Sequence, residues 1–203
     1  MKTWMISFSV AVALTSSGVQ AAPGDAKAGA RKVAVCQACH GPNGNSVVPT
    51  FPKLAGQRPE YIVKELADFK SGNRKNDQMS PQAALVNEQD FQDIAAYFST
   101  QEEAPGAAGS ELAKPGKRIF RSGNAATGVP ACTGCHGPTG MGQNVAKFPR
   151  IAGQHAQYIE TTLKAFRAGT RANDPNSMMR DIAGRMSDQE IAAVSQYVQG
   201  LNP

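Results

Sequence analysis

The stretch CQACH at residues 36–40 recurs as CTGCH at residues 132–136, so the pattern C-x-x-C-H occurs twice in the chain. Two cysteines three positions apart lie on one side of a helical turn, where each thiol can form a thioether with a vinyl group of a haem. The histidine that follows then falls beneath the iron and offers an imidazole nitrogen as an axial ligand. The two copies use all four cysteines and two of the three histidines of the chain. The sequence therefore predicts two covalently bound haem c groups.

The residues predicted to hold each haem follow directly from the pattern. The first haem is attached through Cys36 and Cys39 with His40 on its iron, and the second through Cys132 and Cys135 with His136 on its iron. A zinc site or a redox dithiol is the alternative, because C-x-x-C occurs in both. A zinc ribbon, however, needs no histidine directly after each second cysteine, and a redox dithiol usually occurs once, near a βαβ pattern.

The repeat extends well beyond these motifs. Residues 51–57 read FPKLAGQ and residues 148–154 read FPRIAGQ, at an offset of 97, and three extra residues in the second copy later change the offset to 100. Two copies of about 90 residues indicate duplication into two similar domains. The expected division is a signal peptide at 1–21, a first domain at 22–101, a linker rich in Ala, Gly and Pro at 102–116, and a second domain at 117–203.

Each copy is predicted to contain three main helices, and no convincing strand alternation occurs, so the expected fold class is all-α. Helix starts are predicted at a capping residue or a proline: Asp25, Asn87, Pro59, Pro115, and Ser187 with Glu190 in a capping box. The first helix is expected to run unbroken into the first haem motif. The middle helices are expected to end at Gly72 and Gly169.

Each iron also needs a second axial ligand, and a methionine thioether is expected because it raises the reduction potential. Met79 is the only methionine of the first copy outside the signal, between the middle and last helices. Met179 takes the matching place in the second copy, since it lies eleven residues before Glu190, as Met79 lies eleven residues before Asp90. Met178 is one residue away and remains the main rival.

The other methionines and the spare histidine are expected to have structural roles. Met186 should pack as a hydrophobic staple before the last helix, and Met141 should be exposed. His155 is expected at the surface, which argues against a second imidazole on either iron. The carbonyl of Pro42 or Pro138 is the expected acceptor for the N–H of an iron-binding imidazole.

The first 21 residues are typical of a secretory signal. They contain a single charge at Lys2, an apolar run, and a small-x-small cleavage pattern at residues 19–21. The apolar run is too short to span a bilayer, although an uncleaved N-terminal anchor is the alternative. We expect a soluble, exported mature chain, located in the periplasm if the source is a Gram-negative bacterium.

The formal net charge of +5 is unevenly distributed. Residues 22–103 contain 9 basic and 10 acidic side chains, whereas residues 104–203 contain 11 basic and 6 acidic ones. A dipole of this kind can orient the encounter with a charged partner, although an ordinary solvated surface is the alternative. The export signal, and the lack of aromatic residues among the basic ones, argue against a nucleic-acid partner.

With these motifs the chain resembles the dihaem cytochrome c4 family over its whole mature length. The resemblance depends on the two C-x-x-C-H motifs with their following Gly-Pro, the two F-P-x-[LI]-A-G-Q stretches, and Met79 and Met179. It implies two tandem cytochrome c domains, each with about three main helices around one covalent haem, related by pseudo-twofold symmetry. It further implies periplasmic electron transfer between a quinol-oxidising complex and a terminal haem–copper oxidase, often with loose membrane attachment, and haem propionates that approach one another.

We therefore expect a monomeric electron carrier that transforms no substrate. A dihaem enzyme of the peroxidase or thiosulfate-oxidising type is one alternative. Such an enzyme needs an open iron site and a nearby acid or base, whereas each iron here has an assigned methionine. A bound subunit of a larger respiratory complex is the other alternative, which the lack of a later membrane-spanning segment disfavours.

Overall fold

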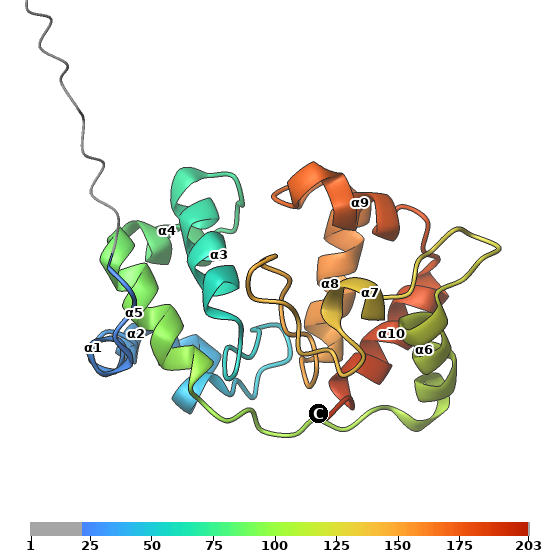
Figure 1. Cartoon of the computed structure of the whole chain (residues 1–203), viewed down its shortest axis with the longest axis horizontal. Coiled ribbons are helices and arrows are strands. Elements are labelled where there is room, and N and C mark those ends of the chain that lie inside the picture. The colour runs from blue at the N-terminus through green and yellow to red at the C-terminus, as the bar shows by residue number, and fades with distance from the viewer. Residues whose placement is uncertain (1–21, 203) are drawn as a thin grey trace, which may run out of the picture.

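The computed structural model describes residues 22–202, which form two helical halves side by side (Figure 1). The first half contains α1 (Ala26–Ala30), α2 (Ala34–His40), the 3-10 turn η1 (Pro42–Gly44), α3 (Pro59–Ser71), α4 (Met79–Ala84) and α5 (Glu88–Ser99). The second contains α6 (Ser110–Ser122), α7 (Thr133–His136), α8 (Ala156–Arg167), η2 (Pro175–Ser177), α9 (Met178–Ala183) and α10 (Asp188–Gln199). The predicted signal at residues 1–21 lies outside the described residues.

The all-α class is confirmed. Over residues 22–202 the only extended pairings are two isolated bridges, Asn124 with Val129 and Gln143 with Phe148. None of the helices in this part of the chain is long and apolar enough to cross a membrane.

Local sequence explains where most helices begin and end. The Asp25 side chain caps α1, and Asn87 and Ser187 cap α5 and α10 in capping boxes that the acidic side chain three residues later completes. All three predicted caps are therefore confirmed. Gly72 ends α3 with a φ of 83°, in the left-handed region that favours glycine.

The first helix of each half crosses the last helix at very short range. α1 packs on α5, and α6 packs on α10. A Cβ atom at Gly29 would lie 2.1 Å from the carbonyl oxygen of Asp93, and one at Gly116 would lie 2.0 Å from that of Ala193. Only glycine permits this approach, and the same crossing in both halves agrees with the predicted duplication.

Three helix limits differ from the predictions. The smallest difference is at α8, which ends at Arg167, two residues before the predicted Gly169. The first helix is not continuous, because a turn at residues 31–33 separates α1 from α2 and places the buried Val33 in the core. Pro115 does not start a helix, because α6 begins at Ser110, so the end of the predicted linker is helical. The N–H of Gly109, just before this helix, donates to Gln196 Oε1 of α10 at 3.0 Å. A contact so distant along the chain leaves no local signal in the sequence.

Candidate haem sites and the contact between the halves

Each C-x-x-C-H motif leads into a short helix that ends at its histidine, and Cys132 caps the start of the second of these helices. α2 ends at His40 and α7 at His136, and the glycine after each has a positive φ that turns the chain away. The first cysteine of each motif, Cys36 or Cys132, is half-buried, while the second is exposed, and none of the four is in a disulfide. Burial raises the pKa of the Cys36 thiol, and it raises that of Cys132 to about 11. The two motifs therefore present their thiols in the same way.

A backbone carbonyl orients each imidazole. His40 Nδ1 lies 2.8 Å from the carbonyl oxygen of Pro52, and His136 Nδ1 lies 2.9 Å from that of Pro149. Because a carbonyl can only accept, Nδ1 carries the proton and Nε2 keeps its lone pair. Burial lowers the pKa of both imidazoles, and the carbonyl contact offsets this only in part. A neutral imidazole with a lone pair on Nε2 is the form that binds a metal ion, so both sites fit haem iron.

The predicted carbonyl acceptors, Pro42 and Pro138, are wrong. The carbonyl of Pro42 instead accepts from the N–H of Asn45 at 3.1 Å, within the turn that η1 makes. The acceptors come from the two F-P-x-[LI]-A-G-Q stretches, whose phenylalanine rings also lie 6.5 Å from the imidazole rings, centroid to centroid. One repeated motif thus supplies both an aromatic neighbour and the orienting carbonyl, and this is the physical role that the sequence pattern left unassigned.

The predicted methionine ligands lie at the start of the short helices that precede α5 and α10. Met79 is the first residue of α4, and Met179 is the second residue of α9, after Met178. A side chain holds the backbone N–H of each: Asn76 Oδ1 accepts from Met79 at 2.8 Å, and Asp174 Oδ2 accepts from Met179 at 3.0 Å. Each methionine is half-buried. Within each half, a side chain of the preceding loop therefore holds the backbone at the methionine in a similar way.

The burial pattern keeps the offset of 100 in this region. Ala83 and Ala183 are both 0% exposed. Met186 is buried in the core of the second half, as expected for a staple, and Met179 packs against the same core. This register supports the pairing of Met79 with Met179.

A zinc site built from both motifs is not supported. Among residues 22–202, no group of three or more His, Cys, Asp and Glu side chains lies close enough to hold a metal ion.

Two residues predicted to be exposed lie in the contact between the halves. His155 is half-buried, and its Nε2 lies 2.9 Å from both Oγ and the carbonyl oxygen of Ser46. Met141 is half-buried as well, and its carbonyl accepts from Arg58 Nε at 2.6 Å. Met141 follows the second haem motif and His155 precedes α8, and sequence alone predicted solvent exposure at both positions.

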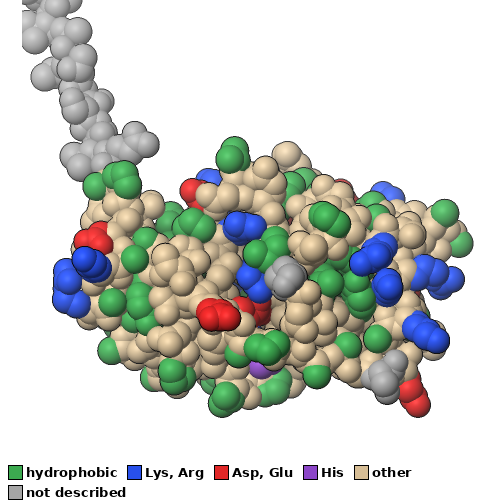
Figure 2. Space-filling model, turned by 60° about the horizontal axis from the view of Figure 1, so that its bottom comes forward, with side chains coloured by type: hydrophobic (Ala, Val, Ile, Leu, Met, Phe, Trp, Pro, Cys, Tyr) green, Lys and Arg blue, Asp and Glu red, His purple; other side chains and the backbone are tan. Residues whose placement is uncertain are grey.

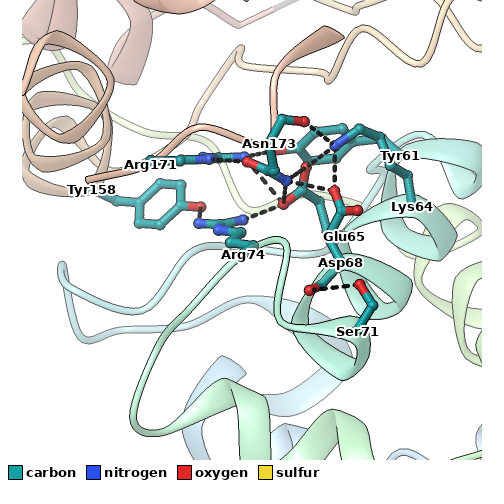
Figure 3. Close-up of polar contacts among 9 residues, drawn as sticks. All are labelled: Tyr61, Lys64, Glu65, Asp68, Ser71, Arg74, Tyr158, Arg171 and Asn173. Atoms are coloured by element: carbon teal, nitrogen blue, oxygen red, sulfur yellow. Dashed lines mark hydrogen bonds and ion pairs between the residues drawn. The ribbon is translucent and has the colours of Figure 1, made fainter. Parts of the chain in front are cut away.

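A buried polar cluster joins α3 to the chain just before α9 (Figure 3). Arg171 Nη2 donates to Tyr61 Oη at 3.0 Å, and Arg74 Nη2 donates to Tyr158 Oη at 3.2 Å. Each arginine also pairs with Glu65, at 2.6 Å for Arg74 and 3.2 Å for Arg171. The two arginines are equivalent positions 97 residues apart, and so are the two tyrosines. Each arginine binds the tyrosine of the other half, so the two contacts form a twofold pair around the single carboxylate of Glu65.

The Glu65 carboxyl is ionised by its neighbours. Burial alone would raise its pKa, but Arg171, Arg74 and Lys64 outweigh burial and hold the pKa at about 2. Asn173 Nδ2 adds a hydrogen bond to Glu65 at 3.0 Å. The cluster therefore contains a buried, fully paired negative charge at neutral pH.

The second half has no matching carboxylates. Asn173 Nδ2 also donates to Asp68 Oδ2 at 2.7 Å, and Lys64 Nζ donates to the Asn173 carbonyl at 2.9 Å. The offset of 97 places Thr162 at the position of Glu65 and Ala165 at that of Asp68. The first half therefore holds the chain ahead of Met179, whereas the second half gives the chain ahead of Met79 only the Tyr158 contact. The sequence pattern alone gives Glu65 no role, although the difference between Glu65 and Thr162 at equivalent positions is a readable signal.

Known proteins match this chain over most of its length. The family model for cytochrome c matches this chain twice, over residues 26–102 and 113–202. Cytochrome c4 of Thiocapsa roseopersicina is 60% identical over 88% of this chain and 94% of its own length. The crystal structure of reduced recombinant cytochrome c4 from Pseudomonas stutzeri has a TM-score of 0.86 and 48% identity, and the match covers 88% of this chain and 100% of that one.

A more distant relative carries a different name. The thiosulfate dehydrogenase electron acceptor of Stutzerimonas stutzeri (strain A1501) is 42% identical to this chain. The match covers 93% of this chain and 90% of the relative. Its name describes a protein that accepts electrons from an enzyme, so the similarity extends to a second kind of electron-transfer protein.

Proposed function

This chain belongs to the dihaem cytochrome c4 family and is an electron-transfer protein, and we propose from this premise that it works in the periplasm between a quinol-oxidising complex and a terminal haem–copper oxidase. The two covalently bound haem c groups supply one-electron chemistry between Fe(III) and Fe(II). The chain's own residues set the ligands, the burial and the docking of these groups. The observation that supports the proposal best is the pair of buried imidazoles, each with a protonated Nδ1 on a carbonyl and a lone pair on Nε2.

The proposal assigns each site residue a role. Cys36 and Cys39 attach the first haem, and Cys132 and Cys135 attach the second. His40 and Met79 are the axial ligands of the first iron, and His136 and Met179 are those of the second. With both axial positions filled from the chain, neither iron offers a place for substrate, so the protein carries electrons without the chemistry of a peroxidase.

The location and the division of the chain belong to the same proposal. Residues 1–21 act as a cleavable export signal, residues 22–101 form the first domain and residues 117–203 the second, with the linker at 102–116 shortened by the start of α6. The mature protein acts as a monomer with loose membrane association. In the periplasm the protein can reach both the quinol-oxidising complex and the terminal oxidase.

A basic surface on the second half supports docking to an acidic partner. Figure 2 shows Lys and Arg side chains gathered at the end of the molecule that the second half forms. Four exposed cations of α6 contribute to this surface: Lys114, Lys117, Arg118 and Arg121. Charge of one sign on one end steers a partner toward that end and raises the association rate at low salt.

The experiment adds the purified holoprotein to membranes that contain either the quinol-oxidising complex or the oxidase. Quinol should reduce both haem groups and oxygen should reoxidise them through the oxidase, while carbon monoxide leaves the reduced spectrum unchanged. Reversing charge with Lys117→Glu and Arg118→Glu should slow one of the two reactions at low salt and have less effect at high salt. Rapid turnover of hydrogen peroxide, or a carbon monoxide complex, would contradict the carrier and favour an enzyme.

The thiosulfate-linked relative supports a second candidate, in which this chain accepts electrons from a thiosulfate-oxidising enzyme. The two candidates differ in the donor and share the same haem sites. Reduction of the protein by thiosulfate dehydrogenase with thiosulfate, at a rate above that with the quinol-oxidising complex, would favour the second candidate. No reduction by that enzyme would dismiss it.

A further inference from the structure

The two F-P-x-[LI]-A-G-Q stretches contact each other through their last residues. Gln154 Oε1 accepts from the N–H of Lys53 at 2.9 Å, and Gln154 Nε2 donates to the Lys53 carbonyl at 2.9 Å. Gln57 makes the same pair of hydrogen bonds with Arg150, at 2.8 Å and 2.9 Å. Because the glutamines are equivalent positions, as are Lys53 and Arg150, the contact is twofold and reciprocal.

Each glutamine reaches the peptide group that orients the histidine of the other half. The carbonyl of Pro52 and the N–H of Lys53 belong to one peptide group. That carbonyl accepts from His40 Nδ1, while the N–H donates to Gln154. A chain of two hydrogen bonds through one peptide therefore links a glutamine of the second half to the imidazole of the first. The reciprocal chain runs through Gln57, the peptide of Pro149 and Arg150, and His136.

Both glutamine side chains are held firmly enough to act on that peptide. Gln57 is 7% exposed and Gln154 is 5% exposed. Each amide oxygen accepts a second hydrogen bond from the N–H of the next residue, Arg58 at 2.9 Å or His155 at 3.1 Å, directly before α3 or α8. A buried amide bonded at both its oxygen and its nitrogen has one orientation, so it fixes the peptide opposite to it.

We propose that Gln57 and Gln154 are positioning residues that act across the contact, each setting the proximal histidine of the opposite half. A peptide whose N–H is hydrogen-bonded has a more negative carbonyl oxygen, which accepts more strongly. A stronger acceptor at Nδ1 makes the imidazole a more basic ligand, and a more basic ligand favours Fe(III). Each half therefore lowers the reduction potential of the haem in the other half. The inference depends on His40 and His136 being iron ligands, as in the proposed function.

The test compares Gln154→Leu with Gln57→Leu in the holoprotein. Gln154→Leu removes both hydrogen bonds to Lys53, so the reduction potential of the first haem should rise. The equilibrium constant for reduction of its Fe(III) to Fe(II) should increase by about two- to tenfold. The second haem should keep its value. Gln57→Leu should shift only the second haem. Voltammetry measures the two potentials, and paramagnetic proton NMR of each haem identifies which one moved and reports the Nδ1–H environment.

Arg58→Met is the matched control, because it removes the hydrogen bond to Met141 across the same contact without touching either peptide. It should leave both Nδ1–H signals in place, and the lost positive charge should lower both potentials, opposite in direction to the rise expected for either glutamine variant. Equal shifts of both haem groups in all three variants would mean general loosening and would overturn the inference, as would a glutamine variant that shifts only its own half or neither half. If Gln154→Leu does not fold, Gln154→Met, which is closer in length, gives the same measurement. If the proposed function is wrong, the wild-type protein itself will lack two histidine-ligated haem groups, before any variant is compared.

Discussion

The contact between the halves has a symmetric part and an asymmetric part. In the symmetric part, Gln57 and Gln154 exchange identical hydrogen bonds with the chain beside each proximal histidine. In the asymmetric part, Glu65 and Asp68 of α3 accept hydrogen bonds from Asn173 of the second half. The second half has Thr162 at the position equivalent to Glu65, so it offers the first half no such carboxylate. Duplication explains the first part, since both partners occur in both copies.

The difference shows that the two halves are alike on the histidine side and unlike on the methionine side. The chain between α8 and α9, which leads to Met179, is anchored to the opposite half by Lys64 Nζ on the Asn173 carbonyl. The chain between α3 and α4, which leads to Met79, is held to the opposite half by one described hydrogen bond, which Arg74 donates to Tyr158 of α8. The same fold therefore contains two halves that are alike around His40 and His136 and differently braced ahead of Met79 and Met179.

The largest expected effect is the loss of a methionine ligand. Met79→Ala and Met179→Ala should each remove half of the near-infrared band that reports sulfur bound to ferric haem, because one ligand belongs to each half. Met178→Ala should leave the band at full strength. If Met178→Ala removes half of the band and Met179→Ala does not, the alignment of the two halves at offset 100 is wrong in this segment.

The next largest effect is the loss of folding stability when the ion pairs of Glu65 are broken. Glu65→Gln leaves the buried guanidinium groups of Arg74 and Arg171 without their counter-charge, which should lower the free energy of unfolding by about 3 kcal/mol. Chemical denaturation of the holoprotein measures this change. Glu160→Gln is the control on the equivalent helix, because Glu160 pairs with Lys164 at a solvent-exposed site, and it should cause no measurable change. Equal costs for the two variants would show that Glu65 is not a central residue of the contact.

The pH dependence of that same cost sharpens the comparison. The pKa of Glu65 falls from its ordinary 4.5 to about 2 in the folded protein, so its contribution is fully present above about pH 4.5 and is lost as pH falls toward 2. Below that range the protonated carboxyl resembles the glutamine that replaces it. The difference in unfolding free energy between wild type and Glu65→Gln should therefore shrink from about 3 kcal/mol near pH 6 toward zero near pH 2. A difference that stays constant over this range would contradict the ion pairing.

Much of the fold was predictable because its signals are local. Asp25, Asn87 and Ser187 cap helices through side chains within three residues, and the repeat revealed the duplication. The break at residues 31–33 and the start of α6 at Ser110 were not predictable, because burial of Val33 and the contact of Gly109 with Gln196 depend on chain that is remote in sequence.

The haem sites, like the fold, have features with a local signal in the sequence and features that depend on remote parts of the chain. The C-x-x-C-H motifs carry their chemistry in their spacing, so the prediction that Cys36, Cys39 and His40 hold a haem needs no knowledge of the fold, and it stays a prediction. The acceptor for the imidazole N–H was misassigned to Pro42, since only the folded chain brings Pro52 to His40. The contact between the halves, including Gln154 on Lys53, stayed hidden because the repeat shows which residues are equivalent but not which ones meet.

Every proposal made for this protein depends on each C-x-x-C-H motif binding one haem through thioether bonds. Mass spectrometry of denatured protein, isolated after export, tests it most directly, followed by fragmentation to locate the added mass. We expect a mass increase of two haem groups, with one on the peptide that contains residues 36–40 and one on the peptide that contains residues 132–136. Protein with no retained haem, or with both groups on a single peptide, would contradict it.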